Sequence, residues 1–419
     1  MTFPDYDILQ SIVARIFRIE QVILGDAQRG FIAQYRGQLY NEDSAAAYEQ
    51  LADGLRSYHI TPLFRQEKGQ QIIVLLPGVT RPGRARISTN IALFILTLLS
   101  VMFAGATYSY QGPLPEDTLG LVLTLIRNLW TGWPFAVSLL AILLAHEFGH
   151  YFAGRFNRTE VTLPYFIPFP LSLLGTMGAF IQLKERPRNK RVLLDIGIAG
   201  PLAGLIVAIP VLVIGLALSE VGRTENTYYI KEPGRFEACQ NAALAGDSYS
   251  CPSDNLLEGN SMLYLGLKYL VKGELLPAPA AYDQPALLYW TRYVFTGQPI
   301  PVGGRDVLLH PVAMAGWAGI LVTFLNLIPA GQLDGGHVLY AIFGRRVRTI
   351  LPVILAVMVG MGFIWNGWWL WAGLIFFVGR GHAEPMDEIT SLDPPRKALA
   401  VLMLAVFLLV LTPVPFITF

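Results

Sequence analysis

Cysteine and charge are both scarce in this chain. The two cysteines among 419 residues, Cys239 and Cys251, are too few for a disulfide framework. One bridge between them fits a segment that faces an oxidising compartment, and two free thiols fit equally well. Charged residues make up 15% of the chain, the formal net charge is +1, and the basic residues form short clusters. We therefore expect no nucleic-acid partner, because such a partner requires an extended basic face.

The first seven residues have neither a basic leader nor an apolar core, which predicts that no cleavable signal peptide is present. Apolar residues nevertheless make up 53% of the sequence. A soluble domain with this balance would expose far too much hydrophobic surface to water. We therefore expect an integral, multi-pass membrane protein whose internal spans direct its insertion into a lipid bilayer.

Residues 1–80 differ from the rest because charged and apolar positions alternate there in short segments. Helical spacing of apolar residues occurs at 8–17 and 44–55, and strand-like runs occur at 31–36 and 70–76. No catalytic motif is found among them. The sequence predicts a small soluble α+β domain at this end of the chain.

A basic linker at 81–90 leads into a membrane-embedded core predicted at 91–415. The arginines of the linker indicate a cytoplasmic flank, so the amino-terminal domain is expected in the cytosol. Within the core, residues 219–310 hold seven Lys/Arg against ten Asp/Glu, which predicts an extracytoplasmic insert. Its apolar run at 263–271 is too short to span and is expected to lie in the membrane interface.

The fold class predicted is an α-helical polytopic membrane protein with about seven transmembrane helices and a small N-terminal soluble α+β domain. A further apolar piece at 119–130 fits either a span or part of one. The predicted spans are 91–108, 134–156, 192–218, a segment that begins at Pro311, 350–364, 368–378 and 398–410.

One of these spans contains the motif His146-Glu147-Phe148-Gly149-His150. Residues four apart project from the same face of a helix, so both imidazoles can bind one ion. Glu147 follows the first histidine closely enough to reach water at that ion. This is the geometry of zinc hydrolases, and the alternative is a pair of histidines hydrogen-bonded between helices.

Two histidines do not complete a hydrolytic zinc site, which usually has three protein ligands. The best candidate for the third ligand is Asp334, in the later segment 326–337. An unpaired carboxylate at this depth costs about 2.5 to 3.5 kcal/mol, which favours a metal as its counter-ion. Pro329 and Gly331 loosen the helix there, so that freed backbone groups can line a cavity. An interfacial turn residue is the alternative for this aspartate.

Three motifs, in this order along the chain, resemble those of the site-2 protease family of intramembrane zinc metalloproteases. They are His-Glu-x-x-His at 146–150, Ala-Gly-Pro-Leu-Ala-Gly at 199–204, and Asn-x-x-Pro-x-x-x-x-Asp-Gly at 326–335. The small residues of the second motif let helices approach closely. The amino-terminal domain and the segment 309–317 are similar to the cyanobacterial and plastid branch of the family.

The resemblance implies one Zn²⁺ ion held by His146, His150 and Asp334, with Glu147 as the general base. It also places an asparagine at position 326, where its amide can steady an oxyanion or the substrate. A structural hydrogen bond to a neighbouring helix is an equally good interpretation of Asn326.

Two further elements are candidates for supporting roles. His337 lies one turn after the aspartate and either orients that carboxylate or faces the cytosolic loop. The segment 175–184 has strand character, and Gly175 and Gly178 allow another backbone to come close. It is our predicted docking strand for an unwound transmembrane substrate, and a hairpin that merely plugs the cytoplasmic mouth is the alternative.

The leading hypothesis is an intramembrane zinc metalloprotease that cuts transmembrane or membrane-anchored proteins near the cytoplasmic side. A membrane metal or proton transporter is the alternative from another class, because intramembrane His and Asp also mark ion pathways. A catalytically silent scaffold is the third, and the intact ligands and base argue against it. The sequence leaves open a bacterial plasma membrane or a thylakoid, and also the oligomeric state.

Overall fold

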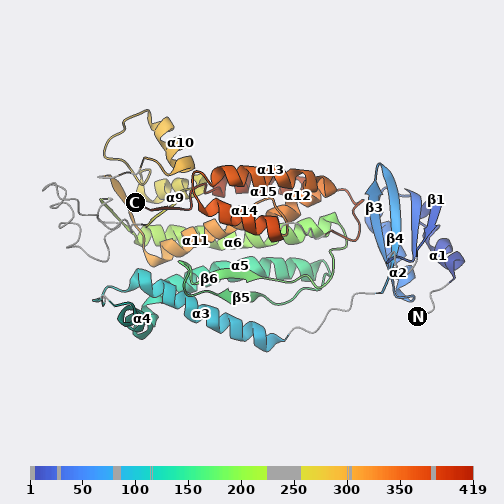
Figure 1. Ribbon diagram of the computed structural model, residues 1–419, viewed down its shortest axis with the longest axis horizontal. Helices are drawn as coiled ribbons and strands as arrows, with labels where there is room; N and C mark the ends of the chain where they lie inside the picture. Colours follow the sequence, from blue (N-terminus) through green and yellow to red (C-terminus); the bar gives the residue numbers. More distant parts are fainter. Residues whose placement is uncertain are drawn as a thin grey trace.

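The computed structural model describes residues 5–25, 30–78, 86–113, 115, 117–223, 256–299, 301, 304–378 and 384–418. Cys239, Cys251 and residues 81–85 of the predicted linker lie outside these residues. Figure 1 shows an elongated molecule in which long helices run along the main axis and a small sheet with two helices forms one end. The chain is mostly helical.

The sheet at this end is four-stranded and antiparallel, in the order β1-β2-β4-β3. This architecture confirms the predicted α+β character, but the helix predicted at 8–17 is too long. Phe17 begins a strand instead. The apolar residues Ile16 and Phe17 fit both the helical and the strand repeat, and hydrogen bonding to β2 selects the strand. Two of the strands, β1 and β3, were not predicted. The elements are α1 (Tyr6–Val13), β1 (Phe17–Leu24), β2 (Ala33–Leu39), α2 (Ser44–Arg56), β3 (Ile60–Glu67) and β4 (Gln70–Pro77).

Three helices of the described chain are long and apolar enough to cross a membrane. They are α3 (Ile87–Ser109), the helical stretch 129–156 that contains α5 (Trp133–Phe156), and α6 (Lys190–Leu218). The undecided piece at 119–130 covers most of α4 (Thr118–Arg127), whose 10 residues extend about 15 Å, roughly half the hydrocarbon thickness, and the start of η1 (Leu129–Gly132). It does not cross the bilayer by itself.

The remaining apolar helices are each shorter than 18 residues, so length and composition do not confirm the predicted count of seven spans. The segment after Pro311 is two helices rather than one, because the turn at 327–333 contains Pro329 and a left-handed Gly331 with φ +58°. These helices are α11 (Pro311–Asn326), α12 (Asp334–Phe343), α13 (Val347–Met361), α14 (Gly367–Val378) and α15 (Pro394–Val410), and η2 (Gly344–Arg346) follows α12.

The centre of the bundle is made by α5, α6 and α11, which pack on one another. Gly149 of α5 faces α6 so closely that a Cβ built there would lie 2.4 Å from the carbonyl oxygen of Ala199. A hairpin of β5 (Tyr165–Pro168) and β6 (Thr176–Phe180) contacts α3 and α5. The packing therefore brings the motif helix, the small-residue motif and the hairpin together.

At the end opposite the sheet lie α9 (Met262–Lys272) and α10 (Ala286–Thr296), as Figure 1 shows. Helix α9 covers the apolar run predicted at 263–271 and packs on α6 and α15. Its buried Lys268 forms an ion pair with Glu258 at 2.9 Å. Two short antiparallel pairs complete this end: β7 (Glu220–Arg223) with β9 (Arg305–Leu308), and β8 (Leu256–Glu258) with β10 (Phe416–Thr418).

Candidate metal centre

Helix α5 carries the first two candidate ligands inside the bundle. His146 and His150 are 4% and 6% exposed, and their four-residue spacing places both rings on one face of the helix. Asp334 is the first residue of α12, directly after the irregular turn that ends α11. The break between the two helices therefore lets a carboxylate reach the face of α5.

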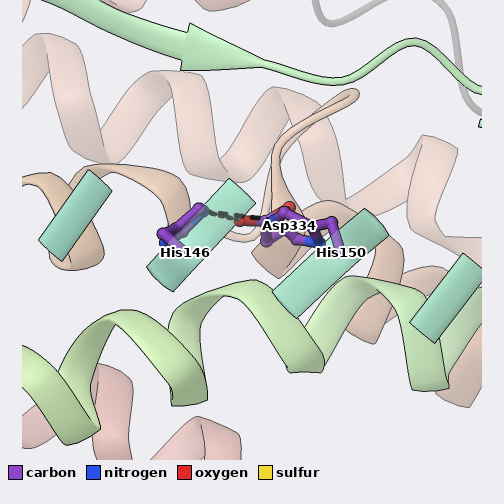
Figure 2. Close-up of side chains that lie close together, drawn as sticks. All are labelled: His146, His150 and Asp334. Atoms are coloured by element: carbon purple, nitrogen blue, oxygen red, sulfur yellow. Dashed lines mark hydrogen bonds and ion pairs between the residues drawn. The ribbon is translucent and has the colours of Figure 1, made fainter. Parts of the chain in front are cut away.

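The three side chains meet at a single point (Figure 2). The Nε2 atoms of His146 and His150 lie 3.2 Å apart, and each lies 3.3 Å from a different carboxylate oxygen of Asp334. Four ligands arranged tetrahedrally at about 2.0 to 2.1 Å from zinc would lie about 3.3 Å from one another. The two nitrogens, and each nitrogen with its nearer carboxylate oxygen, therefore lie at distances typical of ligands that share one zinc ion.

The hydrogen bonding of His150 supports the same conclusion. Its Nδ1 lies 2.7 Å from the carbonyl oxygen of Ile196, which can only accept a hydrogen bond, so Nδ1 donates. In a neutral imidazole, Nε2 then carries the lone pair that points at His146 and Asp334. Lone pairs and a carboxylate gathered in a buried space call for a cation between them.

Glu147 follows the first ligand on α5 and is 4% exposed. Its Oε2 atom is buried and makes no hydrogen bond among the residues that the structure describes. A buried acceptor without a partner is costly, and a water molecule beside the grouped ligands would supply one. The arrangement can therefore accept a proton from that water.

The small-residue motif of α6 lies against both histidines. A Cβ built on Gly200 would lie 2.1 Å from Nε2 of His150, and one on Gly204 would lie 3.2 Å from Cβ of His146. Only a glycine leaves room for the ring at the first position. The glycines thus shape the wall of the site as well as the contact between helices.

Asn326 and His337, the two candidates for supporting roles, precede and follow Asp334 along the chain. The amide nitrogen of Asn326 lies 3.3 Å from Nε2 of His146, so the amide faces the same space as the ligands. His337 packs against α6, where its Cβ is 2.9 Å from the position that a Cβ on Gly197 would take. Both residues stay candidates for the roles that the sequence predicts.

The predicted docking strand at 175–184 is shorter in the structure, where β6 covers only Thr176–Phe180. Gly175 stands before the strand in a left-handed turn at φ +72°, and its carbonyl accepts a hydrogen bond from the Ser100 hydroxyl at 2.5 Å. Gly178 has φ +99°, and no atom lies within 4 Å of a Cβ built on it. The chain therefore leaves open space at the second glycine, whereas the first packs against α3.

Asp195 of α6 is another carboxylate that could be considered as a metal ligand, and one neighbouring group was not predicted. Asp195 makes two hydrogen bonds to Arg396, at 2.8 and 2.7 Å, which explains it without a metal. The carbonyl of Ile196, which fixes the ring of His150, was not predicted from the sequence. No residue pattern signals it, because a backbone carbonyl is present at every position.

Replacing the aspartate tests the ligand set directly. Asp334→Asn keeps an oxygen but loses the negative charge, so the affinity for Zn²⁺ should fall by at least the roughly 10- to 100-fold that loss of an outer-shell partner costs. Competition with a chromophoric chelator measures this change. Glu160→Gln is the matched control, because Glu160 is an exposed acid of the loop after α5 and should bind zinc within about twofold of wild type. Equal affinity of all three proteins would remove Asp334 from the site.

Fold and site together define a membrane-type helical protein with a hydrolase-like metal centre. Residues 134–365 match Peptidase family M50, which is more than half of the chain, and the chain belongs to that family. This membership confirms the predicted resemblance to site-2 proteases. It also confirms zinc as the predicted cofactor, since the group at His146, His150 and Asp334 is placed to bind a metal.

The chain is similar to plant proteins with chloroplastic names. It is 25% identical over 393 residues to "Probable zinc metalloprotease EGY2, chloroplastic" of Oryza sativa subsp. indica, covering 91% of this chain and 61% of the relative. It is 28% identical over 283 residues to "Probable zinc metalloprotease EGY1, chloroplastic" of Arabidopsis thaliana, covering 67% and 43%. The chain therefore spans about three fifths or less of these relatives. No solved structure gave a significant match.

Proposed function

We propose that this protein is an intramembrane zinc metalloprotease that hydrolyses peptide bonds of transmembrane or membrane-anchored proteins. The observation that carries the proposal is the meeting of His146, His150 and Asp334 beside Glu147, whose buried Oε2 atom has no hydrogen-bond partner among the described residues. Membership of Peptidase family M50 and similarity to relatives named zinc metalloproteases support it. A silent scaffold would have no reason to keep this buried carboxylate oxygen next to three grouped ligands.

The residues of the site divide the work of hydrolysis. His146, His150 and Asp334 would hold a zinc ion, which when bound would supply Lewis acidity to water and to a peptide carbonyl. Glu147 accepts a proton from water at the site and returns it to the leaving amine. Asn326 donates its amide N–H toward the carbonyl oxygen of the substrate, which becomes negative during hydrolysis. His337 helps to orient the carboxylate of Asp334.

We further propose that substrates dock along β6. A transmembrane helix satisfies its own backbone, so it must unwind before its carbonyl groups become accessible. Strand β6 pairs with β5 along one edge within a two-stranded sheet, and the open space at Gly178 lies on this strand. The other edge can therefore pair with an extended substrate beside α5.

The orientation proposed has seven spans and a cytosolic amino-terminal domain at 1–80. The spans are α3, α5, α6, the pair α11 and α12, α13, α14 and α15, with residues 219–310 as the extracytoplasmic insert. Basic residues at 184–191 and 345–348 lie toward the sheet end of the bundle, which agrees with a positive inner side. A basic linker at 81–90 joins the domain to the core at 91–415. The membrane is a thylakoid or a bacterial plasma membrane, and chloroplastic relatives favour the first.

A reconstitution experiment separates the protease from a transporter. The purified protein is incubated in detergent with a labelled single-span peptide whose span contains glycine and proline. We expect cleavage that stops after treatment with a chelator and returns when one equivalent of Zn²⁺ is added. The same protein in sealed vesicles should move no Zn²⁺ across the bilayer. Zinc flux without cleavage of any such peptide would favour the transporter instead.

A further inference from the structure

Residues 384–390 connect the amino-terminal sheet to the helical bundle. The backbone N–H of Phe64 in β3 donates to the carbonyl of Met386 at 2.9 Å, and the backbone N–H of Glu388 donates to the carbonyl of Phe64 at 3.1 Å. On its other side the segment pairs with the chain that precedes α6, where Met386 N–H donates to Pro187 O at 2.8 Å. The segment thus links the edge strand β3 to the bundle through isolated bridges at Asp387, to Phe64 on one side and to Asn189 on the other.

The side chain of Glu388 lies at the centre of this junction and is 6% exposed. The hydroxyl of Tyr340 donates to it at 2.6 Å, and Nε of Arg345 lies 3.0 Å from its other oxygen. Nε of Arg65, from β3, lies 3.8 Å from that oxygen. One buried carboxylate therefore joins the sheet, helix α12 and the turn η2.

Arg65 is a buried, fixed partner for the carboxylate of Glu388. Desolvation lowers the pKa of Arg65, and the negative charge of Glu388 opposes that shift. Arg65 also donates to the carbonyls of Phe64, Pro385 and Met386, at 2.9, 3.0 and 3.0 Å. The guanidinium is thus fixed by the sheet and by the segment, and it offers Glu388 a rigid partner.

Helix α12 has Asp334 as its first residue and the buried Tyr340 six residues later, about 9 Å along its axis. Toward α11 the chain passes through the irregular turn at 327–333, with Gly331 in a left-handed conformation. At its Asp334 end, α12 is therefore not continuous with α11. Besides the packing of α12 on α6, its other end is held by the contacts of Glu388 with Tyr340 and Arg345.

We propose that Glu388 is a positioning residue for Asp334: it fixes the end of α12 against Arg65 and so couples docking of the amino-terminal sheet to the geometry of the metal site. This inference rests on the proposed role of Asp334 as a ligand. A loosened sheet would let α12 tilt or slide, and the carboxylate at its start would leave the histidines.

The test compares two glutamine variants in the full-length protein. Glu388→Gln should bind Zn²⁺ about tenfold more weakly and should alter the visible absorption spectrum of the Co²⁺-loaded protein. Glu384→Gln is the matched control from the same segment, because Glu384 also lies beside Arg65 and Arg345 but pairs most closely with Arg348 of α13. It should bind Zn²⁺ within about twofold of wild type and keep the wild-type spectrum.

Tyr340→Phe provides a second route to the same contact and removes only a hydroxyl. It should weaken Zn²⁺ binding about threefold, and the double variant with Glu388→Gln should be no weaker than Glu388→Gln alone. If Glu388→Gln fails to fold, as judged by its thermal unfolding transition, Tyr340→Phe carries the test by itself.

Two results would overturn the proposal: folded Glu388→Gln and Tyr340→Phe proteins with wild-type affinity and spectrum, or an equal loss in Glu384→Gln. The affinity of Asp334→Asn distinguishes this failure from a failure of the site itself. If that variant also binds zinc like wild type, the ligand assignment is wrong and the coupling has nothing to act on.

Discussion

Glu147→Gln is expected to slow peptide-bond cleavage by about 10²- to 10⁴-fold, which is the usual contribution of a general acid–base group. The amide of glutamine is isosteric with the carboxylate but cannot take a proton from water. Zinc content should stay at the wild-type level, because Glu147 is not one of the three grouped ligands. Initial rates with the labelled single-span peptide and metal analysis of the same preparation measure both quantities.

Glu147→Asp is the conservative companion of this variant. It keeps the carboxylate but moves it back by one methylene, so an intermediate rate is expected from a group that acts on a proton at a fixed distance. A merely structural glutamate would give the opposite order, since glutamine preserves its shape better than aspartate does. Wild-type cleavage by Glu147→Gln would exclude the proposed chemistry.

The part of the site that lies within one helix was predictable from the sequence. Helical period alone places His146 and His150 on one face, and the apolar run around them indicates burial. Asp334 lies far along the chain, and it became a candidate through the cost of a buried carboxylate and through its motif. The structure places its oxygens 3.3 Å from the histidine nitrogens.

Tertiary contacts that carry no local pattern were not predictable. The carbonyl of Ile196 acts through the backbone, and Glu388 stands in a polar loop whose charges resemble an ordinary solvated surface. In the amino-terminal sheet, pairing with β2 overrides the helical spacing that continues to Phe17. In the bundle, short helices such as α14 fall below the length by which a span is recognised in isolation.

Gly200→Ala should have the second large effect, although it adds only a methyl group. The new Cβ would lie 2.1 Å from Nε2 of His150, the atom that faces Asp334, and the three nearest atoms all belong to this imidazole, which is hydrogen-bonded to the carbonyl of Ile196. Either the imidazole turns away or α6 moves from α5, and a displacement of about 1 Å at a reacting centre costs on the order of 100-fold. We expect cleavage to fall by more than about 100-fold, together with weaker zinc binding.

Two other glycines provide graded controls for this prediction. A Cβ on Gly204 would lie 3.2 Å from His146, which a shift of a few tenths of an ångström relieves, so Gly204→Ala should cost only about threefold. Gly360 of α13 has no atom within 4 Å of a Cβ, and Gly360→Ala should cleave like wild type. Steady-state rates, zinc affinity and thermal unfolding of the three variants separate the causes. Equal losses in all three would assign the effect to helix stability rather than to the ring of His150, because only the first methyl group reaches the metal-facing nitrogen.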